Sequence, residues 1–324
     1  MTDWRRTSSG RIRTPWRLLL SLSLFVSTVL VISVTVAFTG VVSPPDSTAT
    51  DPFALVVPQV IVGVALAFVT VVAAVYIDRR SLETFGLSFT RRWWSDLVFG
   101  LALGFGLVAG AYLAGIGLGV YEPRFAPAAP DGYTLVRAFA LIAAFTCAVG
   151  VYEELLFRGY LLPNLADGFR AVLGARSAVL GSVALSSVGF GAVHGFNPGM
   201  TPLGTATITA AGVALALGYV LTGRLALPIG FHITWNFAHF VFGLPVSGID
   251  LGIRLLRTER SGSALVHGGA VGPEGGLVGL GAALVGCLAV VAYAALIAND
   301  TDDRSDGGRP TIASTILYDG DSHQ

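Results

Sequence analysis

The stretch Tyr152-Glu153-Glu154-Leu155-Leu156-Phe157-Arg158 follows directly on an apolar run over residues 135–151. A charge at the centre of a bilayer helix costs on the order of 2.5–3.5 kcal/mol on insertion scales, and less near the helix end. Glu154 and Arg158 are four residues apart, so they can pair on one helix face. Glu153 has no such partner nearby and is free for proton chemistry. The alternative interpretation is a charged helix end at the lipid headgroups, held by its own salt bridge.

The composition is that of a membrane protein with several spans. Of the 324 residues, 53% are hydrophobic and 12% are charged, and the mean hydropathy is +0.72. Such values exclude an ordinary soluble domain. The formal net charge is zero, so nothing indicates nucleic-acid binding. We predict an all-α fold, a polytopic membrane helix bundle with about eight transmembrane helices.

Apolar runs of membrane-spanning length define the domain plan. We predict a basic cytoplasmic arm over residues 1–17, an eight-helix membrane domain over residues 18–297, and an acidic disordered tail over residues 298–324. The eight expected spans cover residues 18–42, 53–77, 97–120, 135–157, 178–194, 202–222, 225–243 and 276–297. The third span is rich in glycine at close spacing, which permits close helix packing.

Arginines are distributed unevenly between the two sides of the expected bundle. The connectors on the N-terminal side hold thirteen, five of them within residues 1–17, whereas the opposite loops before residue 244 hold only Arg124. Basic connectors stay on the cytoplasmic side. We therefore predict an integral protein of the cell membrane with both termini cytoplasmic. The loop over residues 244–275 departs from the trend with three arginines, and longer loops follow the rule less well.

Three more polar residues interrupt apolar runs: His194, His232 and Asn236. His232 and Asn236 are four residues apart and share one helix face. A lone histidine within a membrane most often makes a helix–helix hydrogen bond, and that is the alternative interpretation for each of them. Together with the glutamate pair, however, they are the groups needed to activate water and to stabilise an oxyanion.

The roles follow from the chemistry of each group. We predict that Glu153 acts as general base towards a water and that His194 orients this water. His232 and Asn236 would donate hydrogen bonds to the oxygen of a tetrahedral intermediate. Glu154, paired with Arg158, would hold the helix end and tune the field at the base.

A zinc site is the alternative for the same residues. Glu153, His194 and His232 would be the ligands, with one position left open. The chain has no His-Glu-x-x-His helix and no cysteine cluster, so motif support for zinc is weak. We prefer the glutamate version, which needs no metal and no other cofactor.

Three motifs follow one another on successive expected helices: Glu-Glu-x-x-x-Arg, Phe-x-x-x-His and His-x-x-x-Asn. They match at Glu153, Glu154, Arg158, Phe190, His194, His232 and Asn236. The ordered set resembles the type II CAAX prenyl endopeptidase family, the CPBP or Abi intramembrane proteases. The resemblance covers about residues 85–245, which we take as the catalytic core. His239 is not part of the family pattern and is expected to serve packing.

The resemblance implies an α-helical intramembrane endopeptidase whose site opens into a cavity at the membrane. Its substrate would be a membrane-tethered or lipidated peptide or protein within the lipid bilayer. The family is often described as metalloproteases, although a glutamate-dependent mechanism competes with that description. Two other functions stay open: a transporter, which would spread polar residues over several helices, and a non-catalytic membrane scaffold or immunity protein that keeps the residues as a helix-locking network.

Overall fold

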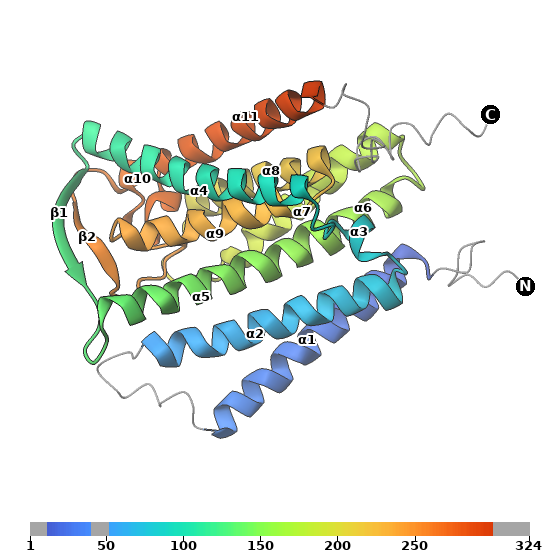
Figure 1. Ribbon diagram of the computed structural model, residues 1–324, viewed down its shortest axis with the longest axis horizontal. Coiled ribbons are helices and arrows are strands. Elements are labelled where there is room, and N and C mark those ends of the chain that lie inside the picture. Colours follow the sequence, from blue (N-terminus) through green and yellow to red (C-terminus); the bar gives the residue numbers. More distant parts are fainter. Residues whose placement is uncertain (1–11, 40–51, 301–324) are drawn as a thin grey trace, which may run out of the picture.

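Helices dominate the part of the chain that the computed structural model describes, residues 12–39 and 52–300 (Figure 1). The longer helices are α1 (Thr14–Thr39), α2 (Pro52–Val72), α4 (Arg91–Gly117), α5 (Leu135–Glu154), α7 (Ala175–His194), α8 (Pro202–Thr222), α9 (Ala226–Val241) and α11 (Leu277–Asp300). The shorter pieces are the π-helices η1 (Ala73–Ile77) and η2 (Leu155–Leu161), the α-helices α3 (Leu82–Phe85), α6 (Leu162–Phe169) and α10 (Ala264–His267), and the 3-10 helices η3 (Gly269–Val271) and η4 (Pro273–Gly275). The predicted polytopic helix bundle is confirmed.

Seven helical segments of the described chain are long and apolar enough to cross a membrane. The eighth expected span, over residues 225–243, is α9, which has only 16 residues. At 1.5 Å per residue such a helix is about 24 Å long, shorter than the roughly 30 Å of hydrocarbon in a bilayer. Most of its side chains are buried within the bundle. The predicted number of about eight is therefore corrected to seven helices of membrane-spanning length and one shorter helix.

The outer parts of the domain plan lie largely beyond the described residues. Residues 1–11 of the expected arm, residues 40–51 and residues 301–324 of the expected tail belong to this remainder. Within the described chain, α1 already begins at Thr14, four residues before the expected first span.

A two-stranded ribbon joins two of the loops in the described residues. Strand β1 (Tyr121–Ala128) pairs antiparallel with β2 (Arg254–Arg260), and Phe125 faces Leu256. The ribbon lies at one end of the bundle (Figure 1). The all-α prediction missed it because the strands come from two loops more than 120 residues apart, so neither loop contains the pattern of a hairpin.

Glycines set the distance between α4 and α9. A Cβ atom at Gly100 would lie 2.3 Å from the carbonyl oxygen of Leu227, and one at Gly104 would lie 2.1 Å from that of Phe231. Both distances are too short for any side chain, so only glycine lets the two backbones meet. The close packing expected of the glycine-rich span is thus present, and it fixes the helix that carries two of the candidate site residues.

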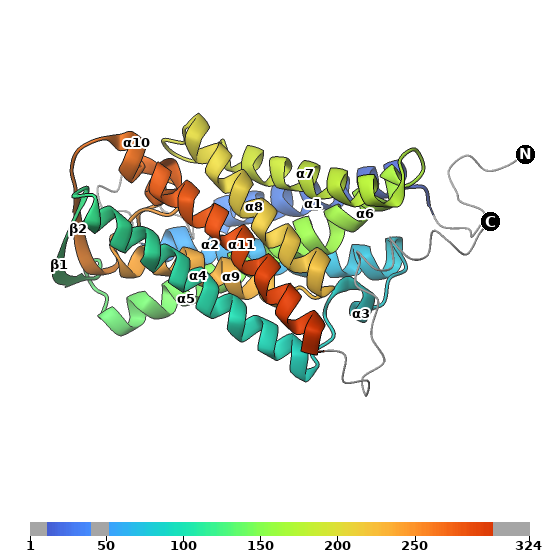
Figure 2. The ribbon, with the colours of Figure 1, turned by 90° about the horizontal axis from the view of Figure 1, so that it is seen from above.

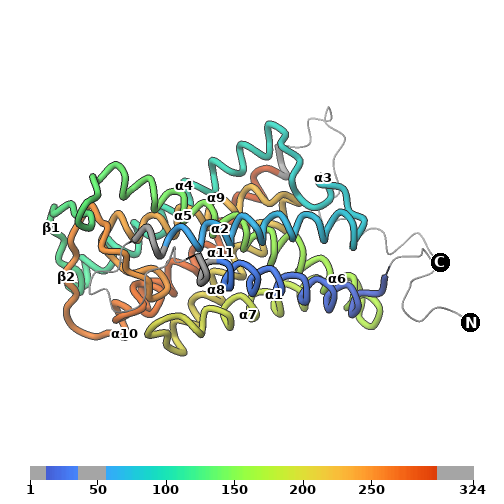
Figure 3. The backbone as a smooth tube through the Cα atoms, turned by 90° about the horizontal axis from the view of Figure 1, so that it is seen from below, coloured from blue at the N-terminus to red at the C-terminus, as the bar shows by residue number. Residues whose placement is uncertain are grey.

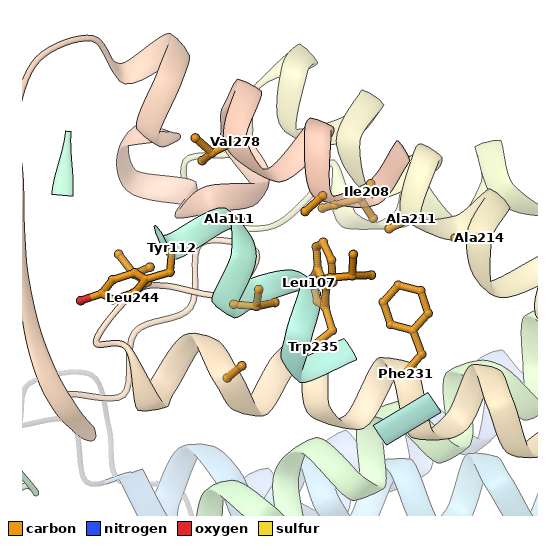
Figure 4. Packing of buried hydrophobic residues seen from close by; sticks show 14 of the residues in the cluster. Leu107, Ala111, Tyr112, Ile208, Ala211, Ala214, Phe231, Trp235, Leu244 and Val278 are labelled. Atoms are coloured by element: carbon orange, nitrogen blue, oxygen red, sulfur yellow. The ribbon is translucent and has the colours of Figure 1, made fainter. Parts of the chain in front are cut away.

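The remaining helices surround this pair. α11 packs across α4 and α8 on one side (Figure 2), whereas α1 and α2 lie side by side along the opposite edge of the bundle (Figure 3). Aromatic and aliphatic side chains of α4, α8, α9 and α11 form the main buried cluster, in which Phe231 and Trp235 rise from α9 (Figure 4). The beginning of α1 and the end of α11 lie at the same end of the bundle as α3 and α6 (Figure 1).

Candidate active site

The glutamate pair lies inside a continuous helical segment. Glu153 and Glu154 are the last residues of α5, and the chain continues through the π-helix η2 into α6. The expected helix end near Phe157 is therefore wrong. Arg158 is fully buried in η2, where it forms an ion pair with Glu154. Because its charge is compensated by this pair, the residue can lie inside a continuing helix. Short π-helical turns of this kind are frequent at functional sites.

Glu153 has one occupied and one open carboxylate oxygen. Its Oε1 accepts a hydrogen bond from the hydroxyl of Tyr152 at 2.9 Å. Its Oε2 is buried without a hydrogen-bond partner in the protein. This atom lies 3.9 Å from Nε2 of His194 and 3.8 Å from Nε2 of His232. An oxygen on α5 therefore lies within 4 Å of a ring nitrogen on α7 and of another on α9.

The two histidines are oriented by hydrogen bonds at their other ring nitrogen. Nδ1 of His194 donates to the carbonyl oxygen of Phe190 at 2.8 Å. Because a carbonyl oxygen can only accept, the proton lies on Nδ1, and in the neutral ring Nε2 presents a lone pair towards Glu153. Nδ1 of His232 bonds Oε1 of Glu154 at 2.8 Å. Both rings thus direct Nε2 towards the open oxygen of Glu153.

Glu154 and Arg158 form the predicted pair, and both residues make further contacts that were not predicted. Nη1 of Arg158 donates to Oε1 of Glu154 at 2.7 Å, the same oxygen that bonds His232. Nη2 of Arg158 donates to the carbonyl oxygen of Gly212 on α8 at 3.2 Å. Its guanidinium also lies over the ring of Phe190, 4.3 Å from the centroid. The pair holds the imidazole of His232 and ties η2 to α7 and α8.

Asn236 stands one helical turn beyond His232. Both line a cavity of about 20 Å³, which is the size of about one water molecule. Glu153 and His194 are not among the residues around this cavity. The lining residues are Phe190, Ile208, Ala211, Leu215, Phe231, His232, Trp235, Asn236, Ser247 and Glu274. Glu153 thus lies within 4 Å of both His194 and His232. Asn236 is connected to this group only through His232, with which it shares the cavity.

The segment that carries these groups has a recognisable family pattern. Residues 135–238 match the family model described as type II CAAX prenyl endopeptidase Rce1-like. The resemblance drawn from the three motifs is therefore confirmed for this segment, which runs from α5 into α9. The match supports a family of CAAX-type intramembrane proteases. No curated protein and no solved structure matches the chain.

The zinc alternative can be compared with the distances between the atoms of its three proposed ligands. Zinc–ligand bonds of about 2.0–2.1 Å in a tetrahedral site place neighbouring ligand atoms about 3.4 Å apart. The oxygen of Glu153 lies 3.9 and 3.8 Å from the nitrogens of His194 and His232, which is wider. Among the described residues, no group of three or more His, Cys, Asp and Glu side chains is placed to hold a metal ion. In the same geometry, a water with hydrogen bonds of about 2.8 Å would place these atoms about 4.6 Å apart, so the observed spacing lies between the value for zinc and the value for water.

The sequence did not lead us to assign a role to two residues that contact this site. Tyr152 was quoted but given no role, although its place beside Glu153 was the available signal. Glu274 bonds the indole of Trp235 from beyond the Rce1-like segment, and no local motif marks it. His239, which was expected to serve packing, is fully buried, and its Nδ1 donates to the carbonyl oxygen of Trp235 at 2.7 Å.

Proposed function

We propose that the protein is an intramembrane endopeptidase of the type II CAAX protease kind. It would hydrolyse a peptide bond of a membrane-tethered or lipidated peptide or protein, close to the membrane. One observation carries the proposal. Inside a bundle of apolar helices, a carboxylate oxygen without a protein partner faces the Nε2 atoms of two histidines within 4 Å.

Water activation is the first step of the proposed reaction. A water between the three groups donates one hydrogen bond to Oε2 of Glu153 and the other to Nε2 of His194. Its oxygen lone pair then points towards the carbonyl carbon of the substrate. Glu153 takes the proton as the new C–O bond forms, which is general base catalysis. Tyr152 keeps the carboxylate in the required orientation by its bond to the other oxygen.

The second step needs donors for the developing oxyanion. His232 donates through Nε2 when its ring carries both protons, and Asn236 donates through its amide one turn along the same helix. Glu154 and Arg158 are supporting residues, since they hold the ring of His232. The tetrahedral intermediate then collapses, the C–N bond breaks, and the proton held by Glu153 passes to the leaving amine.

The proposed site lies among apolar helices, which suits a substrate that is itself anchored in the bilayer. The proposal places the protein in the cell membrane with both termini cytoplasmic, because the arginine-bearing connectors around α3 and after α6 share one end of the bundle with the start of α1. It requires no cofactor; zinc held by Glu153, His194 and His232 is the competing version. The proposed reaction involves no nucleic acid.

Reconstituted protein and a lipidated peptide test the function. Purified protein in liposomes is mixed with a peptide that carries a prenylated cysteine near its C-terminus, and with the same peptide without the lipid. We expect release of a C-terminal fragment, detected by mass spectrometry, from the lipidated peptide. Absence of cleavage with a range of lipidated peptides would contradict the proposal and favour the scaffold.

A strong chelator separates the two mechanistic versions in the same assay. The glutamate version predicts that kcat stays within about twofold of its untreated value after prolonged chelation and removal of metal. A loss of activity that added zinc restores would replace it with the zinc version. The control is a known zinc peptidase treated in parallel, which must lose its activity.

A further inference from the structure

Glu274 is a buried carboxylate outside the Rce1-like segment. It lies in η4, only 4% of its surface is exposed, and it makes three hydrogen bonds. Oε1 accepts from Nε1 of Trp235 at 2.7 Å. Oε2 accepts from the backbone N–H of Ser247 at 2.5 Å and from its hydroxyl at 2.8 Å. One side chain therefore ties the segment after α9 and the segment before α11 to the middle of α9.

The hydrogen bond to Trp235 lies close to the two proposed oxyanion donors in the sequence of α9. Trp235 precedes Asn236 and follows His232 by three residues, so it lies between the two proposed oxyanion donors on α9. Its ring packs beside that of Phe231, with centroids 5.7 Å apart, and rises into the cluster between α4 and α8 (Figure 4). The rotation of α9 about its axis is thus fixed at the turn that presents both donors.

Ser247 and Glu274 also close the small cavity that His232 and Asn236 line. Ser247 has a positive φ of 48°, an uncommon conformation for a residue other than glycine. In this conformation both its N–H and its hydroxyl reach the same carboxylate oxygen. An uncompensated buried carboxylate is costly, and here three donors in fixed positions compensate it. These hydrogen bonds therefore fix a part of the wall of the cavity that both proposed donors also line.

We propose that Glu274 is a positioning residue of the active site. Its carboxylate fixes Trp235 and Ser247 and thereby sets where His232 and Asn236 stand relative to Glu153. This inference rests on the proposed peptidase function for its kinetic consequence, but its structural part holds without it. It gives the segment between α9 and α11 a role in the reaction.

Three variants test the positioning role. Glu274→Gln keeps the size of the side chain but has only one accepting oxygen, so it loses the bonds to either Trp235 or Ser247. Trp235→Phe removes the same bond from the other side. Tyr293→Phe is the matched control, because the Tyr293 hydroxyl donates to buried Asp96 at 2.7 Å, on helices that do not carry the site.

Hydrogen exchange of the α9 amides is measured for all variants, together with cleavage kinetics. We expect faster exchange over residues 232–241 in Glu274→Gln and Trp235→Phe, with unchanged exchange in α7, and wild-type behaviour in Tyr293→Phe. In the cleavage assay kcat should fall about 10- to 100-fold at nearly constant KM, as for displaced catalytic groups. The double variant should be no slower than the slower single variant.

The outcomes separate the two proposals. Unchanged α9 exchange in Glu274→Gln overturns the positioning role, whatever the activity. Faster α9 exchange with wild-type kcat also overturns it, because Glu274 would then only stabilise the fold. A wild-type protein that cleaves nothing, with α9 loosened as expected, leaves the coupling of Glu274 to α9 intact and overturns the peptidase function instead.

Discussion

Two polar clusters of this bundle both combine carboxylates with arginines, and they differ in how the oxygens of their buried acids are engaged. The first, the candidate-site cluster, combines Glu153, Glu154 and Arg158 with His194 and His232. The other, which we call the end cluster, lies where α1 begins and consists of Arg17, Asp78, Arg80, Tyr160, Asn164 and Asp167. Both place acids and arginines among apolar helices, where unpaired charges are costly.

The difference lies in the carboxylate oxygens. Both oxygens of Asp78 are engaged: Oδ1 accepts from Tyr160 at 3.2 Å, and Oδ2 accepts from Asn164 at 2.5 Å. Arg17 and Arg80 add ion pairs at 3.6 and 3.8 Å. Glu153 and Glu154, in contrast, each keep Oε2 without a protein partner, and the open oxygen of Glu153 faces both histidines. A buried acid with every oxygen engaged locks helices together, whereas one with an open oxygen facing two histidines can bind and deprotonate water.

The largest effect is expected from breaking the charge pair that supports the site. Arg158→Met leaves Glu154 buried without its cation, which costs about 3–5 kcal/mol for a buried pair. We expect little folded protein, measured by size exclusion and by thermal unfolding in detergent. The double variant Arg158→Met/Glu154→Gln removes both charges and should recover most of the stability. A single variant as stable as the wild type would show that the pair is not needed for folding.

A smaller effect is expected from the oxygen of Glu153 that is already occupied. Tyr152→Phe removes the hydrogen bond to Oε1 and lets the carboxylate turn away from the water. A hydrogen bond to a charged group is worth about 1.5–3 kcal/mol, so kcat should fall about 10- to 100-fold in the cleavage assay. Tyr112→Phe is the control, since its hydroxyl bonds Thr258 at 2.9 Å near the ribbon. Equal kcat values for both variants would mean that Tyr152 has no part in the reaction.

The end cluster should affect stability and leave the chemistry alone. Asp78→Asn removes the acid between Arg17 and Arg80 and should cost about 1–3 kcal/mol of stability. The kcat per folded molecule should stay within about twofold of wild type, when activity is normalised to the folded fraction from size exclusion. A fall of tenfold or more in that quantity would erase the distinction between the two clusters.

The sequence was sufficient for the parts that depend on local patterns. Runs of apolar residues predicted the bundle, and the ordered motifs predicted which segment matches the Rce1-like family model. The spacing of Glu154 and Arg158 predicted their pair, because four residues make one turn of a helix. The expected meeting of Glu153, His194 and His232 also matches the geometry, although their catalytic roles stay predictions.

The parts that could not be predicted depend on contacts between distant residues. A charged stretch looks like a helix end unless the burial of Arg158 against α7 and α8 is known, so the π-helix was not foreseen. The bond from Glu154 to His232 joins residues 78 positions apart, and that from Glu274 to Trp235 joins residues in different segments. The length of α9 was overestimated because residues just after its end are apolar, although they belong to a turn.

The most direct test of the open oxygen is a change of that atom alone. Glu153→Gln keeps the shape of the side chain and the acceptor for Tyr152, but it removes the base. In liposomes with a lipidated peptide, we predict a folded protein whose kcat is lower by about 10³-fold than that of the wild type, within the range for loss of a general base. Cleavage by folded Glu153→Gln at the wild-type rate would contradict the account.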